Sequence, residues 1–276
     1  MAEVESRDGV RIHYEVDSPE AAGRDAAAVV LLHAAGADAT AWERLGWVAP
    51  LIEAGLRVIR VDARGYGTSG RVTEARQLAG SPCVDDIARV LDAEGVEAAH
   101  LAGYSMGACH AIRFAEAQPQ RVRSLLLGGV VVGALAIQGR HLAPDAEAEA
   151  QRTQALAQLD GALTRLSGYG AEVVRAAREV VRTEHFTQPD LAHVAGARVP
   201  ALIAAGGDDR AAEPWIREKL ARLLPGAQML VVDGADHVGC LASPALREAA
   251  VAFLRERVDA PPSSTGDGGP PEAPPV

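Results

Sequence analysis

The sequence predicts an α/β fold in which a mostly parallel sheet is flanked by helices. Two observations lead to this prediction: short runs of β-branched and other apolar residues recur along the chain, and segments with helical spacing separate them. The runs cover residues 28–33, 57–62, 98–104, 124–128, 199–205 and 227–232. Strands that alternate with helices form parallel βαβ units, whose functional loops lie at the carboxyl ends of the strands.

The first and last regular elements lie outside this repeat. Val10, Ile12, Tyr14 and Val16 alternate with polar residues, which predicts that the chain opens with an antiparallel hairpin. A last helix is expected from about residue 244 to about residue 257.

A segment of about sixty residues without any strand pattern follows Gly133. Within it, Leu156, Leu159, Leu163 and Leu166 recur at intervals of three and four residues, which is the spacing of an apolar helix face. We therefore expect residues 133–195 to be a helical insertion, and residues 1–132 and 196–258 to form the core domain. Residues 259–276 are rich in Pro and Gly and almost without large apolar side chains, which predicts a disordered tail.

Composition argues against several classes of protein. The formal net charge of -10 disfavours a nucleic acid partner, because phosphate binding needs clustered Lys and Arg. Lys219 is the only lysine, and no phosphate-binding GxxxxGK[ST] loop surrounds it. The three cysteines lack the spacing of disulfide-bonded or metal-binding cysteines. The acidic N-terminus lacks the features of a signal peptide. No apolar run is long enough to cross a membrane. We expect a soluble cytoplasmic protein, monomer or homodimer, with a small-molecule substrate and no nucleic acid or membrane partner.

Ser105 stands at the centre of Gly103-Tyr104-Ser105-Met106-Gly107, a Gly-x-Ser-x-Gly motif. A short apolar run, 98–102, precedes the motif, and a helical segment, 108–118, follows it. Strand, sharp turn and helix in this order are typical of a nucleophile elbow, which presents a serine hydroxyl at a helix N-terminus. Ser105 is therefore the candidate nucleophile, and the Met106 N–H is a candidate donor to an oxyanion.

A serine hydroxyl needs a general base, and the base needs an acid that orients it, in the chain order Ser, acid, His. Of the eight histidines, only His237 follows the last acid-bearing strand, so His237 is the candidate base. The strand near residues 201–205 leads into Asp208 and Asp209, two neighbouring candidates for the acid.

The other histidines are interpreted differently from His237. His33 ends a strand and begins the turn His33-Ala34-Ala35-Gly36, whose backbone is a candidate second oxyanion donor. Five others are interpreted as structural or surface residues, with a place in the substrate pocket as the alternative for His185. They are His13, His100, His141, His185 and His193.

Together these motifs resemble the α/β-hydrolase superfamily from about residue 3 to about residue 258. The segments 31–37 and 62–69 are similar to the family's His-Gly turn and its D-x-R-G-x-G-x-S loop. The resemblance implies the α/β-hydrolase fold, Asp209 as the acid, an oxyanion hole of Ala35 and Met106, and a helical cap at residues 133–195. It implies no metal or organic cofactor. The chain departs from the family at Ala34, where Gly is usual and where a Cβ narrows the allowed backbone.

The resemblance is broadly to esterases, enol-lactonases and carbon-carbon bond hydrolases. We expect a serine hydrolase in which Ser105 attacks an ester, lactone or thioester carbonyl of a small molecule while His237 takes its proton. His33 and Tyr104 are expected to line the substrate pocket. The alternatives are a carbon-carbon bond hydrolase of a vinylogous diketone with the same triad, and a ligand sensor without turnover. A nucleotide-dependent reductase is disfavoured, because the first βα turn holds only Gly36 where a dinucleotide fingerprint needs several glycines.

Overall fold

The computed structural model describes residues 2–72, 77, 81–130, 198–212, 214–224 and 226–258. In these residues eight strands form one central sheet. The strands are β1 (Ala2–Glu5), β2 (Arg11–Asp17), β3 (Ala28–Leu32), β4 (Arg57–Val61), β5 (Ala99–Tyr104), β6 (Val122–Gly128), β7 (Ala201–Gly206) and β8 (Gln228–Val232). Their spatial order is β1-β2-β4-β3-β5-β6-β7-β8.

The sheet is parallel except at one edge. β1 pairs with β2, and β2 with β4, in the antiparallel sense, whereas β4, β3, β5, β6, β7 and β8 are parallel to one another. The chain leaves β3 toward β4 on one side and later returns to β5 on the other side of β3. Ligands of open α/β sheets bind at such a change of direction, outside the carboxyl ends of the strands. In this chain His33 and Ser105 follow those ends.

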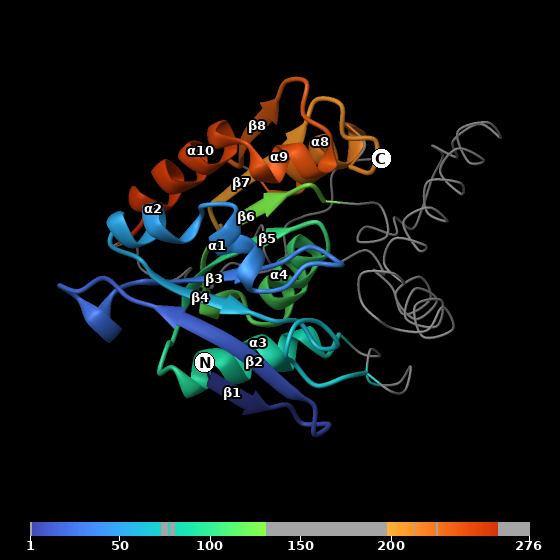
Figure 1. Cartoon of the computed structure of the whole chain (residues 1–276). Helices are drawn as coiled ribbons and strands as arrows, with labels where there is room; N and C mark the ends of the chain where they lie inside the picture. The colour runs from blue at the N-terminus through green and yellow to red at the C-terminus, as the bar shows by residue number, and fades with distance from the viewer. Residues whose placement is uncertain are drawn as a thin grey trace, which may run out of the picture.

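Helices cover both faces of the sheet (Figure 1). One face packs against α3 (Cys83–Ala93), α4 (Met106–Ala117) and α8 (Pro214–Leu223). The other face packs against α1 (Thr40–Arg44), α2 (Val48–Glu53), α9 (His237–Ala242) and α10 (Pro244–Arg255). Two short 3-10 helices, η1 (Gly23–Asp25) and η3 (Pro119–Arg121), complete the described elements.

Successive side chains of each central strand point to opposite faces of the sheet, so the core consists of two hydrophobic clusters, one on each face. Val30 and Leu32 of β3 point into the cluster under α3 and α4, whereas Val29 and Leu31 point into the cluster under α2 and α10. Neighbouring side chains of a strand lie on opposite faces, so a strand covered on both sides is apolar at every position. All five residues of β3 are buried for this reason.

The predicted fold is confirmed, and the strands begin and end within two residues of the predicted positions. The opening hairpin forms, but β2 does not alternate between buried and exposed residues, because the side chain of His13 is buried at 5% exposure. Helix α9 was not predicted from the sequence. The predicted cap at residues 133–195 and the predicted tail at residues 259–276 lie outside the described residues. None of the helices described here combines the length and the apolar character that crossing a bilayer requires.

Candidate active site

Ser105 occupies the turn between β5 and α4 in a conformation that residues with a side chain rarely adopt. Its backbone has φ 53° and ψ -112°, and backbone strain of this kind costs about 1–3 kcal/mol. The Ser105 N–H donates a hydrogen bond of 2.8 Å to the carbonyl oxygen of Gly128, which ties the turn to the end of β6. The surrounding strands therefore hold the serine in its strained position, where the residue is 9% exposed.

Two glycines allow other backbone segments to approach this turn closely. A Cβ on Gly103 would lie 2.2 Å from the carbonyl oxygen of Gly107, and a Cβ on Gly107 would lie 1.9 Å from the carbonyl oxygen of Leu32. Neither position can hold a larger residue unless backbone moves. The contact at Gly107 places the first turn of α4 directly against the end of β3, next to the turn that begins at His33.

Two backbone N–H groups near this contact, those of Met106 and Ala35, are the candidate oxyanion donors. Met106 is the first residue of α4, and the first N–H groups of a helix have no partner within the helix. Ala35 lies in the turn after β3. In the part of the chain that the structure describes, neither N–H donates to a backbone carbonyl.

The turn at His33 is held by a histidine whose tautomer can be assigned. The Ala63 N–H donates to His33 Nε2 at 3.0 Å, so the proton of the ring sits on Nδ1, which donates to the carbonyl oxygen of Ala34 at 2.8 Å. Burial lowers the pKa of His33, which keeps the ring neutral in this role. Ala34 is not among the described residues with positive φ, so its Cβ is accommodated where the family usually has Gly.

The loop at residues 62–69, which resembles D-x-R-G-x-G-x-S, contacts the turn after β3 at the end opposite to His33. The Asp62 Oδ1 accepts a hydrogen bond of 2.7 Å from the Ala39 N–H, and the Asp62 Oδ2 accepts one of 2.8 Å from the Thr68 N–H. The imidazole Nδ1 of His13 lies 2.9 Å from the same Oδ2. The turn after β3 is therefore fixed at both ends, by His33 and by Asp62.

Asp209 and His237 form a hydrogen-bonded pair. The Asp209 Oδ2 lies 2.7 Å from the His237 Nδ1, and the Asp209 Oδ1 accepts bonds of 2.9 Å from the N–H groups of Ala211 and Ala212. Asp209 follows the end of β7, and His237 is the first residue of α9. Asp208, the other candidate acid, is exposed. The structure thus brings Asp209, and not Asp208, to the imidazole.

The environment of Asp209 keeps its carboxyl ionised. Burial alone would raise the pKa of Asp209, but the hydrogen bond and the charge of His237, together with the Ala212 and Ala211 N–H groups, hold it below its ordinary value. An ionised acceptor at Nδ1 holds the proton of a neutral imidazole on Nδ1 and leaves Nε2 as the basic atom. The pair is therefore arranged so that His237 can accept a proton through Nε2.

Tyr104 connects the candidate nucleophile with the candidate base. The Tyr104 hydroxyl donates a hydrogen bond of 2.6 Å to the main-chain carbonyl oxygen of His237, and the two ring centroids lie 5.4 Å apart. No direct hydrogen bond joins the Ser105 hydroxyl to His237 in the described part of the chain. Tyr104 is 1% exposed. Its place in a substrate pocket stays a prediction, as does that of His33, because the residues expected to cover the site are not described.

The remaining described histidines lie apart from the Asp209–His237 pair. His100 is fully buried in β5, where its Nδ1 lies 2.8 Å from the Ser124 Oγ and burial lowers its pKa to about 4. His110, for which the sequence pattern carried no prediction, lies on α4 one turn after Met106. Burial, with His33 nearby, lowers its pKa to about 4. Only its helical spacing from Ser105 could have marked it in the sequence. His141, His185 and His193 lie outside the described residues.

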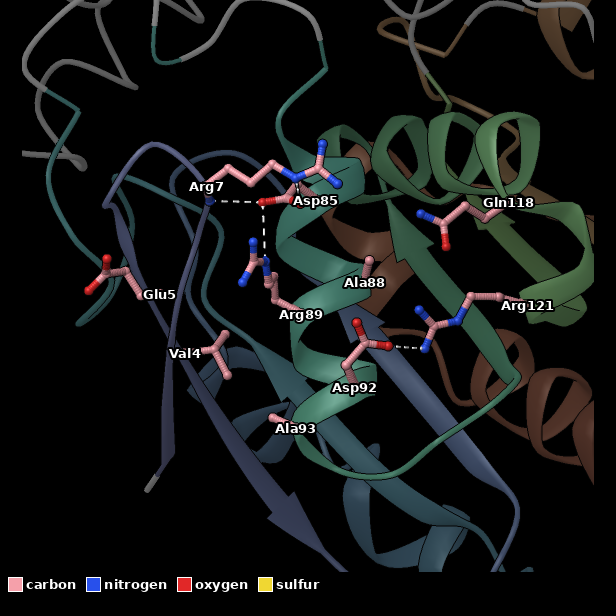
Figure 2. A pocket seen from close by; sticks show the side chains of 10 residues that line it. All are labelled: Val4, Glu5, Arg7, Asp85, Ala88, Arg89, Asp92, Ala93, Gln118 and Arg121. Carbon is pink, nitrogen blue, oxygen red and sulfur yellow. Dashed lines mark hydrogen bonds and ion pairs between the residues drawn. The ribbon is translucent and has the colours of Figure 1, made fainter.

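A groove of about 670 Å³ runs along α3 and does not include any candidate site residue. Figure 2 shows its charged walls, in which Arg7 pairs with Asp85 at 2.9 Å and Arg121 pairs with Asp92 at 2.7 Å. Its lining residues come from β1 and the turn after it, from α3, and from the segment between α4 and β6. The groove is thus separate from the Ser105 turn.

Comparisons with known proteins bear on the family of the chain. A 2-hydroxy-6-oxononadienedioate/2-hydroxy-6-oxononatrienedioate hydrolase of Cupriavidus pinatubonensis is 41% identical over 111 residues, which are 39% of this chain and 37% of that protein. The chain thus spans less than half the length of this relative. A putative carbamate hydrolase RutD of Azorhizobium caulinodans is 29% identical over 263 residues, 82% of this chain and 94% of that protein.

Solved structures share the fold. The enol-lactonase from Burkholderia xenovorans matches with a TM-score of 0.64 at 21% identity, over 92% of this chain and 99% of the other. A carboxylesterase structure from Nitrososphaera gargenis matches with a TM-score of 0.71 at 18% identity, over 94% of this chain and 99% of the other. The model of the alpha/beta hydrolase family matches residues 29–252. With this match, and with the sheet and turn described above, the chain belongs to the alpha/beta hydrolase family.

Proposed function

We propose that the chain is a serine hydrolase that cleaves an ester, lactone or thioester of a small molecule through an acyl-enzyme on Ser105. The observation that carries the proposal is the strained Ser105 at the turn after β5, together with the Asp209–His237 pair. In the same sheet Asp209 follows β7 and His237 follows β8. A strained backbone conformation persists only where the surrounding structure holds it in place, and such strain is frequent at active sites. A His237 side chain that is partly exposed and paired with the buried carboxylate of Asp209, at the same edge of the sheet, supplies the base that such a serine needs.

The first half-reaction transfers the acyl group to the enzyme. His237 Nε2 takes the hydroxyl proton of Ser105 as the serine oxygen bonds to the substrate carbonyl carbon. The N–H groups of Ala35 and Met106 stabilise the negative oxygen of the tetrahedral intermediate, and preorganised donors of this kind contribute about 10²–10³ in kcat each. His237 then gives its proton to the departing alcohol or thiol, and the acyl group remains on Ser105.

The second half-reaction returns the serine. Water replaces the leaving group, His237 removes a proton from it, and the hydroxide oxygen bonds to the acyl carbon. Collapse of the second intermediate breaks the bond to Ser105, whose oxygen regains the proton from His237, and a carboxylic acid is released. Asp209 stays ionised throughout, because its role is to orient the imidazole and to stabilise its positive charge.

The second candidate is hydrolysis of a carbon-carbon bond in a vinylogous diketone with the same three residues. It is favoured by the relatives from Cupriavidus pinatubonensis and Paraburkholderia xenovorans, 41% and 38% identical, whose names specify 2-hydroxy-6-oxo dienedioates. The two candidates differ in the bond that breaks and share Ser105, Asp209 and His237. A cytoplasmic location and a monomeric or homodimeric state stay predictions from the sequence.

A substrate panel tests the proposal and separates the candidates. The wild type and Ser105→Ala are assayed with short-chain esters, lactones, thioesters and vinylogous diketones. Ser18→Ala is the matched control, because Ser18 follows β2 where Asp17 pairs with Val58, at the opposite end of β4 from the functional loops. We expect turnover of one oxygen- or sulfur-ester class by the wild type and by Ser18→Ala, and its loss in Ser105→Ala.

Three outcomes would contradict the proposal in different ways. Turnover of the diketones alone would favour the second candidate. Tight binding of a panel compound without turnover, and without labelling of Ser105 by a fluorophosphonate, would favour a sensor on the hydrolase fold. Turnover that persists in Ser105→Ala would remove the serine from the mechanism.

A further inference from the structure

We infer that Tyr104 is a positioning residue for His237, and that its hydroxyl aligns the main chain of the base with the nucleophile next to it in sequence. The inference rests on the proposed function. It goes beyond the triad, because the Asp209 carboxylate fixes the orientation of the imidazole ring but does not fix the backbone from which the ring extends.

The side chain of Tyr104 is locked in one place. It is 1% exposed and belongs to the cluster under α9 and α10. A Cβ on Gly128 would lie 2.5 Å from the Tyr104 Cδ2, and a Cβ on Gly129 would lie 2.8 Å from the Tyr104 Cζ. The ring therefore packs closely against the backbone at the end of β6, in space that a side chain at either glycine position would fill.

The Tyr104 hydroxyl contacts His237 at a different atom from the one that Asp209 contacts. It donates to the carbonyl oxygen of His237 at 2.6 Å, while Asp209 holds the ring nitrogen at 2.7 Å. Asp236 caps the same helix by accepting a bond of 2.7 Å from the Gly239 N–H. The three contacts hold the backbone, the imidazole and the first turn of α9 separately.

The Tyr104 hydroxyl stays protonated at neutral pH, so it stays a hydrogen-bond donor there. Burial raises the pKa of the Tyr104 phenol far above its ordinary value, and the electrostatic effects of the Cys240 thiol and of the Asp209 carboxylate add to the rise. A phenol that does not ionise cannot serve as an acid or base here. Its contribution is geometric.

The hydrogen bond of Tyr104 links the nucleophile to the base because Tyr104 is covalently bonded to Ser105. Through its bond to the His237 carbonyl oxygen, it joins the strand that carries Ser105 to the helix that carries His237, across 133 residues of sequence. In the described residues no direct hydrogen bond connects Ser105 with His237, so their mutual position depends on such indirect contacts. A misplacement of about 1 Å in a catalytic group can cost about 10²-fold in rate.

Tyr104→Phe tests the inference, because it removes the hydroxyl and keeps the ring against Gly128. Tyr14→Phe is the matched control: Tyr14 is 3% exposed, and its hydroxyl donates a bond of 2.8 Å to the Glu94 Oε1, away from the site. We expect Tyr104→Phe to lower kcat about 10- to 100-fold with KM changed less than about twofold, and Tyr14→Phe to keep the wild-type kcat.

The rate of fluorophosphonate labelling gives a readout that a merely structural role would not move. The final amount of label counts folded sites, whereas the rate of labelling reports how well His237 activates Ser105. We expect Tyr104→Phe to label to the same final amount but about 10- to 100-fold more slowly. The inference is overturned if the labelling rate and kcat equal those of the wild type, or if only the final amount falls.

Failure of the inference can be distinguished from failure of the proposed function. If Ser105→Ala is inactive and unlabelled while Tyr104→Phe behaves as wild type, the hydrolase mechanism stands and the positioning role is wrong. If Ser105→Ala keeps its activity, the proposed function is wrong and the positioning role goes with it.

Discussion

The exchange of Asp209 for asparagine alters a single side-chain group, and the structure predicts how the new amide would orient. The Asp209 Oδ1 accepts bonds from the N–H groups of Ala211 and Ala212, both at 2.9 Å. An amide nitrogen at that place would face two donors, so asparagine keeps its oxygen there and turns its NH₂ toward His237. The imidazole Nδ1 must then accept a hydrogen bond, and the ring proton moves to Nε2.

This tautomer blocks the reaction, because Nε2 is the atom that has to take the proton of Ser105. We expect kcat of Asp209→Asn to fall about 10⁴-fold, equivalent to about 5.5 kcal/mol of transition-state stabilisation. The side-chain volume and the two bonds to Ala211 and Ala212 are kept, so KM is expected to change little. The assay is the initial rate on the best ester of the panel, with thermal unfolding as the measure of folding.

Asp208→Asn is the matched control for this prediction, since it makes the same chemical change one residue earlier at an exposed side chain. We expect its rate to stay within about twofold of the wild type, because exposed substitutions away from special contacts have small effects. The assignment of Asp209 as the acid is wrong if Asp209→Asn keeps a tenth or more of the wild-type kcat, or if Asp208→Asn loses as much activity as Asp209→Asn.

Two further predictions concern packing and pH. In Gly107→Ala, the new Cβ would lie 1.9 Å from the Leu32 carbonyl oxygen, so the backbone next to Met106 must move. We expect this movement to lower kcat at least about 10²-fold. An unchanged kcat would contradict the close approach of α4 to β3. Burial lowers the pKa of His100 to about 4 in the folded protein. As the pH falls, the unfolded chain therefore protonates this histidine below about pH 6.5, whereas the folded protein protonates it only near pH 4. We expect this difference to remove about 3 kcal/mol of stability between those pH values, and His100→Asn, followed by urea unfolding across the same range, to flatten the slope.

Local sequence patterns were sufficient for the fold and for the parts of the site that depend on one segment. Ser105 could be placed at a strand-to-helix turn because its glycines, the apolar run before it and the helical segment after it are adjacent in sequence. The same holds for the turn at His33. His237 could be singled out by chain order, although the short helix that it begins has too few residues to show a helical period.

Contacts between distant segments could not be predicted in the same way. Asp208 and Asp209 are neighbours of the same type, and only the path of the chain after β7 decides which of them is buried toward His237. The bond from Tyr104 to the carbonyl oxygen of His237 involves the main chain of the acceptor, which leaves no trace in residue type. His13 looked like one polar position of an alternating strand, yet its imidazole lies against the buried carboxylate of Asp62.

The kcat of Ser105→Ala relative to the wild type tests the central claim most directly, measured on the ester or lactone that the wild type turns over fastest. We expect a loss of about 10⁴- to 10⁶-fold with thermal unfolding close to that of the wild type, because the serine, the base and the acid act as a unit. A variant that folds and keeps a tenth or more of the wild-type kcat would contradict the claim that the substrate is cleaved through Ser105.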